Sequence, residues 1–76
     1  MTEDVDPKVP AAEYVERVTN SLKEGSIVRL KGRGKNAPRA IVILERCKHE
    51  VPGLAYTIQI LKEDADSVLQ VDFHPA

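Results

Sequence analysis

The first regular pattern of apolar and polar positions along the chain lies in residues 10–25. Pro10 can begin a helix there, because the first turn of a helix does not use the N–H that proline lacks, and Gly25 suits a helix end. Between them, apolar side chains recur every three or four residues. We therefore predict an amphipathic helix whose apolar positions are Tyr14, Val15, Val18 and Leu22.

The next pattern, in residues 26–31, is an alternation that is typical of a strand. A loop with two glycines follows it at residues 32–37, so cations on the strand emerge where the chain enters this loop. The alternation places Val28 and Leu30 on one face and Ile27, Arg29 and Lys31 on the other.

Pro38 can begin a second helix that runs to about His49, before the sequence VPGL ends it. Val42 and Ile43 flank the core-facing stripe of this helix and make it broader than one sheet needs, which favours a dimer interface. The positions predicted to face the core are Ala40, Ile41, Leu44 and Cys47.

Two further alternating segments, residues 54–62 and 67–73, predict the strands of a hairpin. The sequence EDADS between them supplies turn residues. The predicted apolar faces carry Leu54, Tyr56, Ile58 and Ile60 on the first strand and Leu69, Val71 and Phe73 on the second.

The elements follow in the order helix, strand, helix, strand, strand, which predicts an α+β fold with two helices on one face of a small mixed sheet. The first ten residues hold three acids and two prolines. We expect a flexible lead-in at residues 1–9, with room for a short edge strand, and a single domain at residues 10–76.

Length and composition narrow the class of protein. A chain of 76 residues forms one small domain that buries only about 60% of its unfolded surface, which favours association with a second copy. The content of 42% hydrophobic and 30% charged residues suits a soluble globular protein. Because no apolar run approaches the roughly 20 residues that cross a bilayer, and the first residues are acidic, we expect a cytoplasmic protein without a membrane partner.

The residues that most often carry catalysis or bind metals are sparse. Cys47 has no second cysteine with which to form a disulfide, and its position in the helix is typical of a small buried hydrophobe. Together with His49 and His74 it fits no recognised metal-ligand spacing. Neither histidine has an evident nucleophile beside it. We expect no cofactor, no metal and no enzymatic activity.

Charge is distributed unevenly along the chain. The net charge is -1 and the pI is about 6.1, which excludes a protein that coats nucleic acid by bulk positive charge. Between Arg29 and Arg39, however, the chain carries five basic residues and no acidic one. Any binding of anions must therefore be local to this interval.

Glycines interrupt the basic interval at Gly32 and Gly34. Glycine allows positive φ and a close approach of backbone N–H groups to a ligand, and the second helix begins just beyond, so the segment could bind phosphate. The alternative is that the charged side chains only solvate a loop. The spacing fits neither the Walker A motif nor GxGxxG. Candidate ligands of phosphate are Arg33, Lys35 and Arg39, extended along the strand by Arg29 and Lys31.

The segments KVPAAEYVERVTNSLKEG and IVRLKGRGKNAPRAIVILER, with the closing hairpin, resemble the Alba family of archaeal chromatin and RNA-binding proteins. The resemblance implies a β-α-β-α-β-β fold, a dimer formed through the second helix and neighbouring strands, and sequence-tolerant binding of DNA or RNA. Lys8 corresponds to the first lysine of the family's nucleic-acid-contacting and acetylatable pair. By the same correspondence Arg33, Lys35 and Arg39 match basic positions of the loop and of the second helix.

The chain departs from the family's pattern at three places. Val9 replaces the second lysine of the pair, the first residues are acidic and form strands poorly, and the hairpin turn is short and acidic where the family has a long basic arm. A glycine loop before a helix is also found in KH domains, but the glycine spacing here differs from their GxxG clamp.

The leading hypothesis is therefore a non-enzymatic, dimeric, Alba-like protein of the cytoplasm or nucleoid that binds the sugar–phosphate backbone of DNA or RNA. One alternative is a protein-interaction module that keeps the fold without strong nucleic-acid binding, and another is an enzyme or a sensor of small anions. The candidate nucleic-acid-binding residues are Lys8, Arg29, Lys31, Arg33, Gly34, Lys35 and Arg39.

Overall fold

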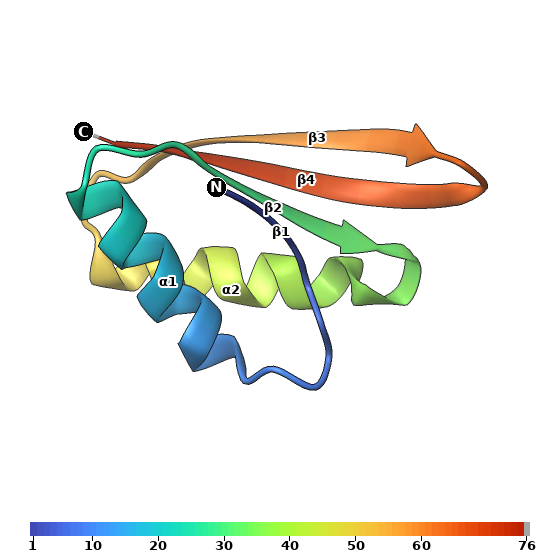
Figure 1. Ribbon diagram of the computed structural model, residues 1–76, viewed down its shortest axis with the longest axis horizontal. Coiled ribbons are helices and arrows are strands. Elements are labelled where there is room, and N and C mark those ends of the chain that lie inside the picture. Colours follow the sequence, from blue (N-terminus) through green and yellow to red (C-terminus); the bar gives the residue numbers. More distant parts are fainter. Residues whose placement is uncertain (76) are drawn as a thin grey trace.

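Two helices lie against one face of a four-stranded sheet in the computed structural model, which describes residues 1–75 (Figure 1). This arrangement confirms the predicted α+β class with two helices on one face of a mixed sheet. The elements are β1 (Thr2–Asp4), α1 (Ala11–Lys23), β2 (Val28–Arg33), a 3₁₀ turn η1 (Gly34–Asn36), α2 (Ala37–Glu50), β3 (Ala55–Glu63) and β4 (Asp66–His74).

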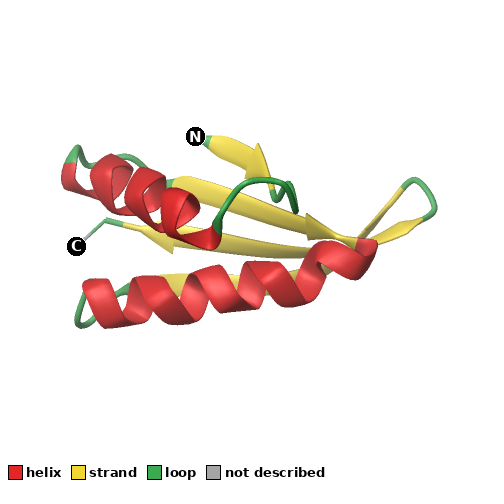
Figure 2. Ribbon diagram, turned by 90° about the horizontal axis from the view of Figure 1, so that it is seen from below, coloured by secondary structure: helices red, strands yellow, loops and turns green. Residues whose placement is uncertain are grey.

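The strand order in the sheet is β1-β2-β4-β3, with β1 parallel to β2 and the other pairs antiparallel. Along β2, Val28, Leu30 and Gly32 are buried under the helices, and the residues between them point to the other face of the sheet. That other face has no helix over it among the described residues, as the two views of the ribbon show (Figure 2). The sheet therefore has one covered face and one uncovered face.

The beginning of the chain is part of the sheet. Residues 1–9, for which the sequence predicts a flexible lead-in with room for an edge strand, contain the edge strand β1. The expectation that the acidic start forms a strand poorly is wrong for Thr2–Asp4. The free edge of β2 supplies backbone partners there, and Glu3 accepts a hydrogen bond from Arg17 at 2.7 Å. Val5, only 5% exposed, then enters the core.

A second anchor holds the segment between β1 and α1. The buried hydroxyl of Tyr14 accepts a hydrogen bond from the backbone N–H of Asp6 at 2.7 Å and donates one to the carbonyl of Asp4 at 3.2 Å. The ring of Tyr14 thus packs in the core while its hydroxyl holds the backbone of this segment by hydrogen bonds, as the hydroxyl of a buried tyrosine usually does.

The core lies between the helices and the strands β2 and β4. Helix α2 contributes Ala40, Ile43, Leu44 and Cys47 to it, whereas Ile41 is only half-buried. The prediction of Ile41 as a core residue is wrong, because positions 40, 43, 44 and 47 form the i, i+3, i+4, i+7 stripe of a helix and position 41 lies at its margin.

The hairpin of β3 and β4 is longer than predicted. Its strands pair from Ala55 with His74 to Glu63 with Asp66, so only residues 64 and 65 form the turn. The turn of the hairpin projects beyond the beginning of α2 (Figure 1). No helix of residues 1–75 is long and apolar enough to cross a membrane.

Candidate nucleic-acid interface

The glycine-rich segment folds differently from the loop that the sequence predicts. Gly32 is part of β2 and has no positive φ; its role is to let α2 begin against the strand. A Cβ atom on Gly32 would lie 2.8 Å from the carbonyl oxygen of Asn36 and 2.9 Å from the Cα of Ala37. Gly34 does adopt positive φ, at 53°, and opens the 3₁₀ turn. Of the two glycines, only Gly34 has the backbone conformation expected of an anion-binding turn.

Three of the candidate cations, Arg29, Lys31 and Arg33, line the uncovered face of the sheet along β2, and we call them the basic stripe. Their side chains alternate with the buried residues of the same strand, which places all three on one face. Acidic side chains from the other three strands reach them, so the stripe is part of an ion-pair network.

Glu63, the last residue of β3, reaches across β4 to two of these cations. Its Oε2 accepts a hydrogen bond from Lys31 Nζ at 2.9 Å, and its Oε1 accepts one from Arg33 Nη2 at 2.9 Å. Arg33 also lies 3.4 Å from Asp4 of β1. Hydrogen bonds from Lys31 and then Arg33 lower the pKa of Glu63, and the bond to Glu63 raises the pKa of Arg33.

Asp72 of β4 stands directly opposite Arg29 in the sheet. Arg29 donates from Nε to Oδ1 at 2.9 Å and from Nη2 to Oδ2 at 3.2 Å, the two-pronged geometry that suits a guanidinium and a carboxylate. These bonds lower the pKa of Asp72 and raise that of Arg29. Gln70, only 4% exposed, lies opposite Lys31 in the sheet and donates a hydrogen bond from Nε2 to Asp72 Oδ2 at 3.4 Å.

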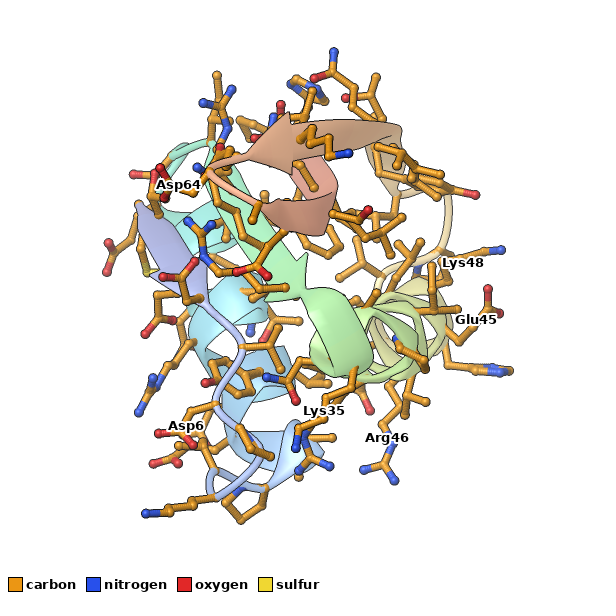
Figure 3. All side chains as sticks on the ribbon, turned by 90° about the vertical axis from the view of Figure 1, so that its right-hand side faces the viewer. Asp6, Lys35, Glu45, Arg46, Lys48 and Asp64 are labelled. Carbon is orange, nitrogen blue, oxygen red and sulfur yellow. The ribbon has the colours of Figure 1, made fainter. Side chains whose placement is uncertain are left out.

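The other candidate cations lie around the start of α2. Arg39 donates from Nη2 to the carbonyl of Val9 at 2.7 Å, which fastens the segment before α1 to the first turns of α2, while its Nε is buried without a partner among the described atoms. Lys35 is exposed in the 3₁₀ turn; Figure 3 shows it beside the start of α2, apart from Asp64 of the hairpin turn. Lys8 is exposed next to the carbonyl that Arg39 binds.

The structure therefore divides the candidate residues into two groups. Lys8, Lys35 and Arg39 form no ion pair within residues 1–75, whereas the basic stripe is balanced by carboxylates. Lys35 and Arg39 lie at the start of α2, and Lys8 precedes Val9, whose carbonyl Arg39 binds. Sequence reasoning missed Glu63 and Asp72. The strand register could have located Asp72 opposite Arg29, but no local signal points to Glu63, which lies 32 and 30 residues along the chain from its two partners.

The structure gives no sign of a reactive cysteine or of a metal site in residues 1–75. Cys47 is buried in the core, and desolvation raises the pKa of its thiol to about 11, which disfavours the reactive thiolate. Within residues 1–75, no three histidine, cysteine or acidic side chains are grouped as a metal ion would need.

Comparisons with known proteins establish a likeness of fold. No family model matches the chain, and no curated protein matches it. Among solved structures, Alba from Thermoplasma volcanium superposes with a TM-score of 0.62 over 96% of this chain and 95% of that one, at 20% sequence identity. The chain thus has an Alba-like fold, in agreement with the resemblance found in its sequence.

Proposed function

We propose that this protein binds the sugar–phosphate backbone of DNA or RNA, without a catalytic step and with little preference for sequence. The proposal is carried by one observation. Three cations on an Alba-like scaffold have no carboxylate partner within residues 1–75: Lys35 and Arg39 at the start of α2, and Lys8 next to Val9, whose carbonyl Arg39 binds. A cytoplasmic protein is expected to meet both kinds of nucleic acid, and binding to DNA would place it on the nucleoid.

The mechanism that this arrangement supports is electrostatic. Lys35 and Lys8 present exposed ammonium groups, and the positive φ of Gly34, next to Lys35, is a backbone conformation that anion-binding turns use. Three phosphate contacts for each protomer give log K a slope of about -2.7 against log salt on duplex DNA, or about a 40-fold loss of affinity from 50 to 200 mM salt. With so few contacts, the dissociation constant is expected at about micromolar or weaker.

We also propose that the protein acts as a homodimer. Val42 of α2 is 45% exposed, and Ile58 and Ile60 of β3 are 44% and 78% exposed. The two isoleucines lie opposite Val71 and Leu69, on the face of the sheet that the helices cover, but the helices pack over β2 and β4. A second copy would cover this apolar surface and would place two cation clusters on one particle. Ile60→Lys is expected to shift the protein to monomer in sedimentation velocity.

A salt titration tests nucleic-acid binding. We expect fluorescence anisotropy with a duplex DNA and an RNA of equal length to give a slope that Lys35→Ala reduces by about 0.9 and Lys8→Ala with Lys35→Ala by about 1.8. Lys23→Ala, at the far end of α1, removes the same charge as the single variant and is the matched control. Equal slopes for Lys35→Ala and Lys23→Ala would refute the site.

A protein-interaction module is the second candidate. It is favoured by the carboxylates that balance the basic stripe and by the acidic turn residue Asp64, since both repel phosphate. If neither duplex DNA nor RNA binds at 50 mM salt while the dimer persists, this candidate replaces the first.

A further inference from the structure

The uncovered face of the sheet carries a charge pattern that the proposed site does not use. The three cations of the basic stripe, Arg29, Lys31 and Arg33, are paired with three carboxylates, Asp72, Glu63 and Asp4, which we call the masking carboxylates. Glu63 bonds both Lys31 and Arg33, and Asp4 is a second, more distant partner of Arg33. Each carboxylate comes from a different strand, β4, β3 and β1 respectively, so the pairing depends on the assembled sheet and not on sequence neighbours.

The cations are spaced for a polyanion. They occupy alternate positions of one strand, which places successive cation-bearing residues about 6.4–6.8 Å apart along it. Neighbouring phosphates on a nucleic-acid strand are separated by a comparable distance. The middle of the same face is polar, because Gln70 donates a hydrogen bond to Gln59 there at 3.4 Å. Beside Arg33 the register places two apolar residues, Val68 and Leu61, on this face.

Each ion pair of the mask has at least one partner that solvent reaches. The exposed fraction of the side chain is about one-third for Glu63 and Arg33 and about half for Arg29, but 17% for Lys31 and 14% for Asp72. Salt screens the exposed partners, and of the pairs that Glu63 and Asp72 form, that of Arg33 with Glu63, in which both are about one-third exposed, is the weakest held. A multivalent phosphate chain competes for such cations more effectively than a single carboxylate does, because several contacts form together.

We infer that the uncovered face of the sheet is a second phosphate-binding surface that Glu63 and Asp72 keep masked. The surface opens when a nucleic-acid strand displaces the carboxylates or when their charge is removed. This inference rests on the proposed nucleic-acid binding and adds an autoinhibitory control to it: the cluster near Gly34 makes the first, weak contact, and the stripe adds contacts afterwards.

The test is the double variant Glu63→Gln with Asp72→Asn, whose amides are close in shape to the carboxylates they replace. Arg29 and Lys31 then lose their carboxylate partners, so two additional phosphate contacts form and steepen the salt slope by about 1.8. The variant is expected to lose about 12-fold more affinity than wild type from 50 to 200 mM salt and to bind more tightly at 50 mM. Circular dichroism melts verify that it is folded.

The matched control is Asp64→Asn with Asp66→Asn, which removes the same charge from the hairpin end without touching the stripe. The mask is supported if Glu63→Gln with Asp72→Asn gains more affinity for nucleic acid than the control does, and if adding Arg29→Gln with Lys31→Gln abolishes this gain. This result supports the mask even if wild type alone does not bind. Wild-type binding with equal gains in both double variants overturns the mask and leaves the proposed function standing. If wild type and both double variants fail to bind duplex DNA and RNA, the mask and the proposed function both fail.

Discussion

Replacing Gly32 with alanine tests the claim that this residue allows α2 to begin against β2. The new Cβ would lie 2.8 Å from the Asn36 carbonyl oxygen, 2.9 Å from the Ala37 Cα and 3.0 Å from the Ala40 Cβ. The first two are backbone atoms, one in the 3₁₀ turn and one in the first turn of the helix, so no flexible side chain can move aside. Overpacking of this kind costs about 1–3 kcal/mol.

The expected result is a large loss of stability. At a cost of about 2 kcal/mol, a domain of this size loses about 8–16 °C from its melting temperature. Urea unfolding followed by circular dichroism at 25 °C gives the same difference as a change in free energy of unfolding.

Gly34 supplies the control, because glycine is favoured there by the backbone conformation and not by a lack of space for a side chain. A Cβ there meets nothing within 4 Å, but φ is 53°, so alanine is strained by about 1–2 kcal/mol for conformational reasons alone. Asparagine tolerates this region of φ and should recover part of the loss at Gly34, whereas at Gly32 it should be worse than alanine. A Gly32→Ala protein with wild-type stability, or a rescue by asparagine at Gly32, would refute the close approach.

Three further predictions follow from single side chains. Tyr14→Phe removes a hydroxyl that bonds two backbone groups and leaves the N–H of Asp6 unpaired, so it should cost about 1–3 kcal/mol in urea unfolding, and no change would contradict the anchor. Folding lowers the pKa of Glu63 below 4.5 and that of Asp72 below 3.8, the values of the unfolded chain. The two ionised carboxylates therefore stabilise the fold above these unfolded values, and this stabilisation is lost as the pH falls through their lowered pKa values in the folded protein. The melting temperature of Glu63→Gln should accordingly depend less on pH between about 5 and 2 than that of wild type. Cys47, with its pKa raised to about 11, should react with a thiol reagent at pH 8 only slowly until urea unfolds the protein, and rapid reaction of the native protein would show that the thiol is accessible.

Local patterns predicted the elements well, because helices and alternating strands depend on neighbouring residues. Helix α1 begins and ends within two residues of Pro10 and Gly25, as the sequence indicates. Strand β2 buries Val28 and Leu30 as predicted. These features need no knowledge of the rest of the chain.

The errors concern contacts between distant segments. Gly32 was expected in a loop, but pairing with Leu69 of β4 extends the strand through it. Thr2–Asp4 has little strand propensity of its own, and the edge of β2 orders it. The carboxylate of Glu63 sits over the basic stripe only because β4 lies between β2 and β3, so the electrostatic character of the candidate site depended on topology.

The position of β4 in the sheet also governs how the protein can be made. Strand β4 joins β2 to β3, so until Asp66–His74 has left the ribosome neither of those strands has its main partner. During synthesis Val28 and Leu30 lack their neighbours Phe73 and Val71 until β4 is made, so part of the core is incomplete and we expect the nascent chain to need protection from aggregation until β4 pairs. Closing the sheet in one late step also means that the domain should fold as a single unit, with no stable fragment made of its first fifty residues.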